Sequence, residues 1–311
     1  MTRILITGAA GGIGQALLAE MPYGHDILAT DIRPPAGMPE GAEYRALDVR
    51  GDDPDMVIGD WKPDVVVHLA SIVTPPKGST RGFEYSVDVE GSRKVLDACV
   101  AHGVRRIVVT SSGAAYGYHA DNPIPLRETD ALRGNEEFAY AHHKRLVEDM
   151  LSEARRDHPE LEQVVLRVGT VLGAGIENQI TALFRRDPLL GIRGSDSPFV
   201  FIWTKDLARI LLRAATDGPP GIFNVAGDSA LGTNDLAAAL GKKVRWLSPT
   251  LLKLALGIAH PLGLSRYGPE QVRFLQFRPV LDNTKLKAEF GYVPELTSAD
   301  VFDLWRKGAG L

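Results

Sequence analysis

Short apolar runs alternate with helical segments through most of the first 170 residues, and this alternation restricts the possible folds more than any other feature. The runs are rich in β-branched residues, and none is long enough for a buried helix. Continuous apolar strands connected by helices form a parallel sheet that is covered on both faces. With right-handed crossovers, the pattern predicts an α/β fold, a Rossmann-like doubly wound parallel sheet. The predicted strands are RILITG, HDILATD, AEYRALDV, PDVVVHLAS, RRIVVTSS and LEQVVLRVGTV.

The pattern becomes less regular after Thr170. We therefore expect a nucleotide-binding Rossmann domain over 1–170 and a smaller substrate-binding lobe within 171–311. Its parts, approximately 171–198 and 226–280, are interleaved with the last strands of the sheet. Ligands bind at the carboxyl edge of such sheets, so the lobe should cap that edge. The predicted helices lie near 177–185, 204–215, 233–240 and 283–290, and the predicted strands are FVFIW and GIFNVAG.

Composition excludes several classes of partner. The chain has 311 residues and a net charge of −4, which argues against a nucleic-acid-binding surface. Its single cysteine, Cys99, excludes an internal disulfide framework and suits a reducing, cytoplasmic compartment. Lys253, His260 and Pro261 interrupt the most apolar stretch, LSPTLLKLALGIAHPLGL, so we expect no membrane partner. The eight histidines show no metal-binding spacing, which predicts no metal site.

A glycine-rich loop follows the first predicted strand. Gly8 would allow a tight turn, and Gly14 would let the next helix pack closely on the strand. Between them, the loop would bring backbone N–H groups and a helix N-terminus to a pyrophosphate. The strand before the loop and the helix after it favour a dinucleotide site over a plain turn. The predicted cofactor residues here are Gly8, Gly11, Gly12, Ile13 and Gly14.

An acidic residue ends the second predicted strand. Asp31 lies 17 positions after Gly14, where its carboxylate would bind the adenine ribose hydroxyls and repel a 2′-phosphate. This predicts NAD rather than NADP. Arg33, two residues further on, could bind a 2′-phosphate, so NADP stays open. Asp48, after the third strand, is either a contact to adenine or an ordinary strand-end residue.

Tyr140 and Lys144 lie one helical turn apart in the segment FAYAHHKRLVEDML. A tyrosine hydroxyl titrates near ~10, and a neighbouring ammonium would lower its pKa towards neutral pH. Ser111 and Ser112 end the fifth predicted strand at the carboxyl edge of the sheet. Together these residues suggest a serine that holds a substrate oxygen and a tyrosine that moves its proton.

These segments resemble the extended short-chain dehydrogenase/reductase superfamily, specifically the NAD-dependent epimerase/dehydratase family. The similarity runs through nearly the whole chain, in order. It includes TGAAGGIG at 7–14, SSGAAYG at 111–117, YAHHK at 140–144, LRVGTVLG at 166–173 and RPVLDNTKLKAEFGYVP from Arg278 onward.

The resemblance implies a Ser-Tyr-Lys catalytic set. Counting back from Tyr116, it assigns the serine to Ser112 rather than Ser111. It implies that Lys144 also binds the nicotinamide ribose, and that Tyr140 contributes to the cofactor site. Further implied cofactor contacts are Asp48 and Val49 at the adenine, and Leu69 and Ala70 along the cleft.

Several departures from the family pattern concern the substrate. Thr170 stands where nucleotide-sugar enzymes usually carry Asn, and Phe199 stands near an expected arginine. Arg278 remains at a phosphate-contact position. These three are the candidate substrate residues. Trp203 replaces a usual histidine, and Asp88 replaces a usual Asn behind the catalytic groups.

Three functions are consistent with these residues. The first is an NAD-dependent oxidoreductase that acts on a secondary alcohol or ketone, either sugar-like or more apolar. The second is a nucleotide-sugar epimerase or dehydratase with tightly bound NAD. The third, a non-catalytic dinucleotide-binding regulator, is disfavoured because the chain keeps Tyr140 and Lys144. A homodimer is expected from the resemblance. His142 and His143 are interpreted as surface or packing residues, and His68 as a hydrogen-bonded core histidine.

Overall fold

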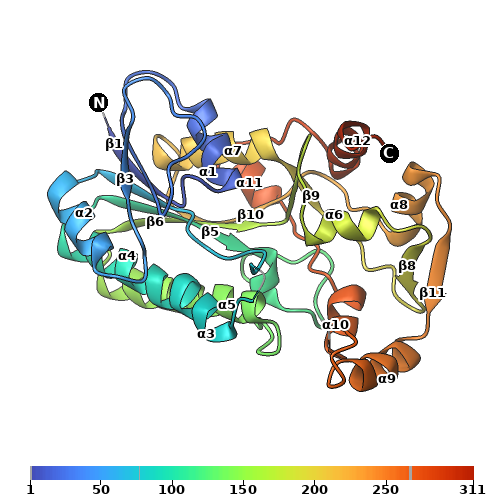
Figure 1. Cartoon of the computed structure of the whole chain (residues 1–311). Helices are drawn as coiled ribbons and strands as arrows, with labels where there is room; N and C mark the ends of the chain where they lie inside the picture. The colour runs from blue at the N-terminus through green and yellow to red at the C-terminus, as the bar shows by residue number, and fades with distance from the viewer. Residues whose placement is uncertain (1, 77, 266–267) are drawn as a thin grey trace.

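The computed structural model describes residues 2–76, 78–265 and 268–311. Seven parallel strands form the central sheet in the order β10–β6–β5–β4–β1–β2–β3 (Figure 1). The first six strands follow the order of dinucleotide-binding folds, and β10 extends the sheet beyond β6. The predicted Rossmann-like sheet is therefore confirmed. Its strands are β1 (Arg3–Thr7), β2 (Asp26–Asp31), β3 (Glu43–Ala46), β4 (Val65–His68), β5 (Arg106–Ser112), β6 (Glu162–Val168) and β10 (Gly221–Val225).

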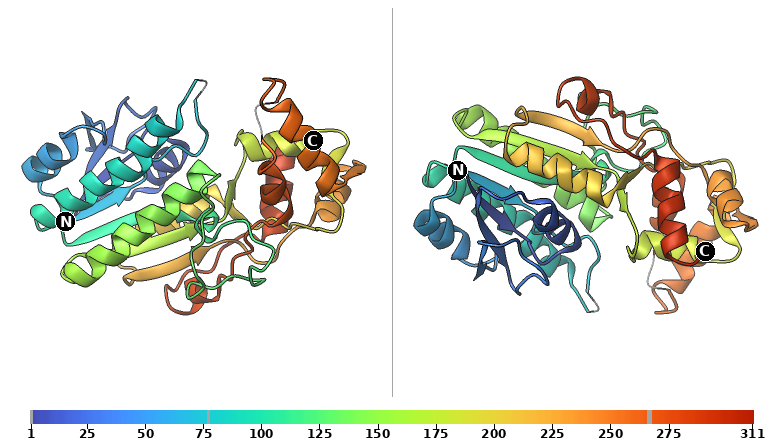
Figure 2. Two further views of the ribbon diagram at one scale, coloured as in Figure 1. Left: turned by 90° about the horizontal axis from the view of Figure 1, so that it is seen from below. Right: turned by 90° about the horizontal axis from the view of Figure 1, so that it is seen from above.

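Helices cover both faces of this sheet. Figure 2 shows α4 and α5 on one face and α1 and α7 on the other. Strand side chains alternate between the faces. Ile4 and Ile6 join the core under α1 and α7, whereas Leu5 joins the core under α2, α4 and α5. The helices are α1 (Gly12–Glu20), α2 (Asp53–Trp61), α4 (Gly91–Ala101), α5 (Ala139–Asp157) and α7 (Thr204–Ala215).

A π-helical turn interrupts the long helical segment before β5. The segment begins as α3 (Arg81–Tyr85), passes through η1 (Ser86–Glu90) and continues as α4. Such turns are rare in proteins overall, and those that occur are often found at functional sites. Here the turn carries Asp88. A short 3₁₀ helix, η2 (Gly113–Tyr116), follows β5.

The lobe contains two small parallel sheets and an aromatic core. β7 (Thr170–Leu172) pairs with β9 (Phe201–Trp203), and β8 (Leu189–Ile192) pairs with β11 (Val244–Leu247). The core between them contains Phe184, Phe199, Phe201, Phe302 and Trp305. The helices of the C-terminal half, besides α7, are α6 (Gln179–Phe184), α8 (Thr233–Leu240), α9 (Pro249–Ala259), α10 (Gln271–Gln276), α11 (Thr284–Ala288) and α12 (Ser298–Gly308).

The single strand predicted over 161–171 is wrong, because the chain changes sheets at Gly169. β6 pairs with β10, whereas β7 leaves the central sheet to pair with β9. The predicted ranges for α7 and α8 are confirmed, and α6 and α11 are shorter than predicted. The sequence interpretation missed β8, β11, α9, α10 and α12. Within the described ranges, the structure contains no helix with the length and apolar character needed to cross a bilayer.

Candidate active site

The glycine loop links β1 to α1 and leaves no room for side chains at two positions. Gly8 has a φ of +70°, and a Cβ there would lie 2.6 Å from the backbone nitrogen of Ala70. A Cβ at Gly14 would lie 2.5 Å from the carbonyl oxygen of Gly8. Only glycine accepts both the left-handed conformation and these close approaches. The loop therefore brings the start of α1 next to the end of β4.

The N-terminus of α1 can bind an anion. Gly11 is the N-cap, and no side chain of the described residues caps this helix. A Cβ at Gly12 would meet nothing within 4 Å, so the backbone here borders open space. Ile13 is half-buried against the sheet core. First-turn N–H groups and the helix dipole favour a phosphate at such a position. These residues fit the pyrophosphate of a dinucleotide.

The adenosine end of the site lies at the tips of β2 and β3. Asp31 is half-buried, and its carboxylate accepts a hydrogen bond from the backbone N–H of Ala10 (3.1 Å). The side chain of Arg33 is exposed, and its backbone N–H donates to Asp31 (3.3 Å). Asp48 forms an ion pair with Arg50, which lowers the pKa of the Asp48 carboxyl. Val49 is buried and packs against Gly91, since a Cβ on Gly91 would collide with the Val49 side chain.

The end of β4 is joined to the glycine loop by hydrogen bonds. The backbone N–H groups of Leu69 and Ala70 donate to Thr7 Oγ1 (3.3 and 3.4 Å). Thr7 Oγ1 also lies 2.8 Å from His68 Nδ1, and His68 Nε2 lies 2.9 Å from Ser92 Oγ. Burial lowers the pKa of His68 to about 3, so the imidazole is neutral. The prediction of a hydrogen-bonded core histidine is confirmed.

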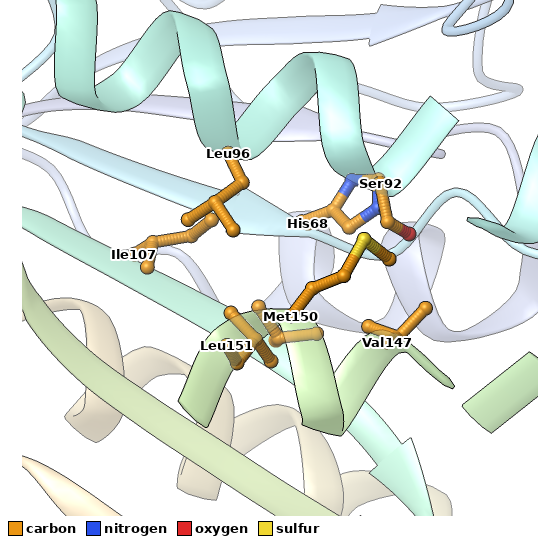
Figure 3. Close-up of a pocket in the computed structure, with 8 residues that line it drawn as sticks. His68, Ser92, Leu96, Ile107, Val147, Met150 and Leu151 are labelled. Carbon is orange, nitrogen blue, oxygen red and sulfur yellow. The ribbon is translucent and has the colours of Figure 1, made fainter. Parts of the chain in front are cut away.

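His68 and Ser92 also line a small cavity between α4 and α5 (Figure 3). The other side chains around it are apolar and include Met150 and Leu151. Its volume of about 10 Å³ accommodates at most one water molecule. This cavity is therefore too small for a substrate or cofactor.

The two serines at the end of β5 have different partners. Ser111 is buried and donates to the carboxylate of Glu148. Ser112 is half-buried, and its hydroxyl lies near enough to Tyr140 to lower the pKa of the tyrosine. The structure thus brings Ser112, rather than Ser111, to the tyrosine. Both serines therefore face α5 but at different turns of the helix, Ser111 at Glu148 and Ser112 at Tyr140.

Lys144 lies beneath Tyr140 on α5. Its side chain is buried, and its ammonium donates to the carbonyl oxygen of Thr110 (2.8 Å). The ammonium nitrogen lies 5.6 Å from the centre of the Tyr140 ring. Burial raises the pKa of Tyr140 to about 12, while the Ser112 hydroxyl lowers it. The expected pKa below the ordinary value is therefore not found in this structure, because burial outweighs the stabilising groups.

Asp88 connects helix α5 to the segment that follows β4. Its carboxylate accepts hydrogen bonds from the Ser71 hydroxyl (3.0 Å) and the Ile72 N–H (2.7 Å). Its second oxygen lies 3.0 Å from His143 Nδ1, and both side chains are almost fully buried. The packing interpretation of His143 is confirmed, but the sequence did not predict its bond to Asp88. His142 is half-buried and lies near Arg145.

A second buried ion pair lies behind Ser111. The guanidinium of Arg167 donates to both oxygens of Glu148, at distances between 2.7 and 3.0 Å. The same guanidinium donates to the hydroxyl of Tyr116 (2.8 Å). This pair fixes α5 to β6 and was missed from the sequence. Glu148 lies one turn after Lys144 on the same helix, which is the signal that could have identified it.

The lobe contributes an arginine held between aromatic rings. The guanidinium carbon of Arg278 lies 3.9 Å from the ring centre of Phe199 and 5.2 Å from that of Phe274. We call these three residues the Arg278 stack. Arg278 donates to the carbonyl and hydroxyl of Ser197 (2.7 and 2.9 Å). Among the described residues it has no carboxylate partner, and its Nε is buried without a hydrogen bond. Burial lowers the pKa of Arg278 to about 9.

Two predicted substrate residues occupy unexpected surroundings. Phe199 is 5% exposed and stacks on Phe201 within the lobe core, so it supports Arg278 instead of lining an open surface. Thr170 begins β7, is half-buried, and bonds through its backbone to Val200 (3.1 Å). Over the described ranges, no three His, Cys, Asp or Glu side chains are grouped as metal ligands would be.

Aromatic side chains of α10 and its C-terminal end belong to the same cluster as Tyr140. Tyr140 belongs to an apolar cluster with Tyr118, Phe138, Phe274 and Phe277. Tyr118 makes edge-to-face contacts with both Phe138 (5.0 Å) and Phe274 (5.3 Å). The lobe therefore meets the Rossmann half directly beside Tyr140.

Comparison with known proteins gives consistent matches. The model of the NAD dependent epimerase/dehydratase family matches residues 4–226. An uncharacterized protein of Mycobacterium tuberculosis is 26% identical over 319 residues, covering 99% of this chain and 84% of that protein. The UDP-glucose 4-epimerase of Azospirillum brasilense is 30% identical over 216 residues, covering 62% of this chain and 60% of the enzyme.

Solved structures show the same fold. The UDP-glucose 4-epimerase of Thermotoga maritima with UDP-glucose has a TM-score of 0.76 at 20% identity, covering 99% of this chain and 98% of that one. MoeE5 in complex with UDP-glucose and NAD has a TM-score of 0.75 at 22% identity, with the same coverage.

Proposed function

Because the chain belongs to the NAD dependent epimerase/dehydratase family, we propose that it transfers hydride between NAD and a secondary alcohol or ketone, with Tyr140 as the acid/base. One observation carries this proposal. The hydroxyl of Ser112 lies close to Tyr140, and a buried Lys144 lies on the same helix, at the sheet edge where the glycine loop also lies. Family membership also supports an enzyme over a non-catalytic regulator.

Ser112 and Tyr140 act on the reacting oxygen of the substrate. Ser112 holds the alcohol or carbonyl oxygen, and the phenolate of Tyr140 accepts the proton when the alcohol is oxidised. In the reverse direction the phenol returns this proton to the new alkoxide. When bound, NAD supplies the hydride acceptor or donor. Lys144, anchored on Thr110, fixes the catalytic helix and offers its remaining ammonium hydrogens to the nicotinamide ribose.

The charge of Lys144 favours the phenolate form of Tyr140. Burial is the largest influence on the pKa of Tyr140, which is about 12 and too high for efficient proton transfer at neutral pH. A bound oxidised cofactor would add a second positive charge near the phenol and would lower this pKa.

The cofactor residues fit NAD. Asp31 presents a carboxylate at the end of β2, where it would accept hydrogen bonds from the ribose hydroxyls and repel a 2′-phosphate. Leu69 and Ala70 line the loop beside Gly8. Asp48 and Val49 would border the adenine. Arg33 points to solvent and leaves use of NADP possible in a variant that lacks Asp31.

The Arg278 stack supports a substrate with an anionic group. A half-buried guanidinium without a carboxylate partner is stabilised when a ligand supplies the negative charge. We assign substrate binding to the lobe, approximately 171–198 and 226–280, with Thr170 at its entrance.

The second candidate function is that of a nucleotide-sugar epimerase or dehydratase. It is favoured by Arg278 and by the UDP-sugar enzymes among the related proteins. A homodimer and a cytoplasmic location remain proposals that rest on the family resemblance and on composition.

The dinucleotide content of the purified protein tests both candidates. The protein would be denatured, the released dinucleotide identified, and the exchange rate of added NAD measured on the native protein. Slowly exchanging NAD would favour an enzyme that returns the hydride to its own substrate, hence an epimerase or dehydratase. Empty or rapidly exchanging protein would favour net redox. Absence of binding to both NAD and NADP would refute the proposed function.

A further inference from the structure

The helix α9 and the turn after it expose more large apolar side chains than any other segment of comparable length among the described residues. Helix α9 has no buried residue, and Leu251, Leu254 and Ile258 lie on one face with exposures of 57 to 68%. Leu262 and Leu264 continue this surface and are 65 and 79% exposed. Contiguous apolar surface of this kind marks a site of interaction. We refer to these five residues as the α9 face.

The sequence around the α9 face is strongly cationic. The 34 residues from Leu236 to Pro269 contain five Lys or Arg and no Asp or Glu, in a chain whose net charge is −4. Lys243, Arg245 and Lys253 are exposed and form no ion pair within the described part of the chain. Apolar and cationic side chains thus occupy one segment, while the acidic residues lie elsewhere.

We propose that the α9 face binds the surface of an anionic phospholipid bilayer. Exposed leucines beside unpaired lysine and arginine are the pattern of helices that lie in the membrane interface. Each basic residue near an anionic leaflet strengthens binding, and the leucines add buried apolar area. The helix has 11 residues, about 17 Å, so it can lie on a bilayer but cannot span its ~30 Å core.

The charge pattern argues against a second copy of the chain as the partner. A two-fold contact places the same patch on both subunits, so the cationic segment of one copy would face that of the other. Like charges across an interface are unfavourable. An anionic lipid surface instead neutralises them.

The position of α9 would bring the active site close to the bilayer. Figure 1 shows α9 at the outer end of the lobe, beside α10 and away from the central sheet. Helix α10 carries Phe274, which packs on Tyr118 in the cluster around Tyr140. This proposal concerns surface attachment only, since none of the described helices could span a bilayer.

Vesicle flotation of the full-length protein tests this proposal. The probes are phosphatidylcholine vesicles with or without about a third phosphatidylglycerol, at about 0.1 M salt and at several times that concentration. We expect flotation only with the anionic vesicles and its loss at high salt. The double variant Leu254→Gln/Ile258→Gln should lower binding at least about tenfold. Lys253→Gln and Arg245→Gln should each lower it about fivefold.

Matched controls separate attachment from misfolding. Met56→Gln changes an apolar side chain on α2 that is 56% exposed and should leave flotation unchanged. The α9 variants should keep the thermal midpoint and cofactor binding of the parent protein, because their side chains are exposed. Unchanged flotation in the double variant would overturn the proposal. A second result would also overturn it: the protein does not float with vesicles, and light scattering shows a dimer that the double variant disrupts.

Discussion

The glycine loop and the Arg278 stack are both proposed to bind an anion, but they are constructed differently. The loop uses backbone N–H groups at the start of α1, and its shape follows from close contacts such as Gly8 against Ala70. The Arg278 stack uses one side chain, held by two aromatic rings and by Ser197. The first is determined by the fold, whereas the second is determined by a few side chains.

This difference separates cofactor binding from substrate choice. Any chain with the same strand–loop–helix geometry presents the same backbone donors to a dinucleotide. The stack can change charge or size by single substitutions without disturbing that loop. We therefore expect substitutions in the lobe to alter substrate affinity and substitutions in the Rossmann half to alter cofactor affinity.

The largest effect should come from Tyr140, the proposed acid/base, which is expected to meet both the cofactor and the substrate. Tyr140→Phe removes the proton donor while keeping the ring in its aromatic cluster. We expect kcat to fall by about 10²–10⁴, because this is the usual contribution of a general acid/base. Steady-state kinetics would measure the loss, and the dissociation constant for NAD should remain within about twofold of the parent. Full turnover in this variant would contradict the mechanism.

Arg278→Gln tests the lobe alone. It removes the guanidinium, and with it the charge that an anionic substrate group would bind. We expect KM for such a substrate to rise about 10- to 100-fold, the usual size of a lost hydrogen bond to a charged group. NAD affinity should not change. Since Arg278 also packs on Phe199, thermal unfolding of the variant must be compared with that of the parent protein. Equal loss of NAD and substrate affinity would indicate that the two halves are not separable.

The same contrast explains which features were predictable from the sequence. Gly8, Gly14 and Asp31 lie within a single β1–α1–β2 unit, and the strand and helix patterns around them are local. The doubly wound fold of the cofactor half could therefore be predicted. Ser112 and Tyr140 lie 28 positions apart, but the strand end and the helix face that carry them were also recognisable.

Contacts between distant segments could not be predicted from a local pattern. Arg278 bonds to Ser197, 81 positions earlier, and Asp88 bonds to His143, 55 positions later. The pairing of β8 with β11 likewise depends on segments more than 50 residues apart. No periodicity in one segment specifies which residue of another segment it meets, so the Arg278 stack and the Asp88–His143 pair appear only in the folded structure.

A smaller effect is expected at the adenosine end of the Rossmann half. Asp31→Ala removes the carboxylate that disfavours a 2′-phosphate, while exposed Arg33 remains nearby. We expect the ratio of NAD to NADP affinity to fall about tenfold, since each hydrogen bond to the carboxylate contributes about 1.5 kcal/mol or more. Titrations of both dinucleotides would measure the ratio, and Arg33→Ala in the same background should reverse part of the change. An unchanged ratio would refute the role of Asp31.

The smallest expected effect concerns Asp88, whose carboxylate lies between the segment after β4 and helix α5. Its negative charge raises the pKa of both Tyr140 and Lys144, although burial is the larger influence on each. Asp88→Asn removes this charge but keeps an acceptor for Ser71 and Ile72. The pKa of Tyr140 should therefore fall. Alcohol oxidation requires the phenolate, so its rate rises with pH through this pKa, and the rising limb should move to lower pH.

His143→Gln provides the matched control, because it removes the imidazole partner of Asp88 while the carboxylate stays. The groups that hydrogen-bond to the Asp88 carboxylate are His143, Ser71 and the Ile72 N–H, while Tyr140, Lys144 and His68 interact with it through charge. Since His143→Gln keeps the Asp88 carboxylate, the rising limb should not move to lower pH. If Asp88 served structure alone, both variants would melt at lower temperature and neither would shift the limb. A shift confined to Asp88→Asn would instead show that the carboxylate adjusts the acid/base pair by its charge.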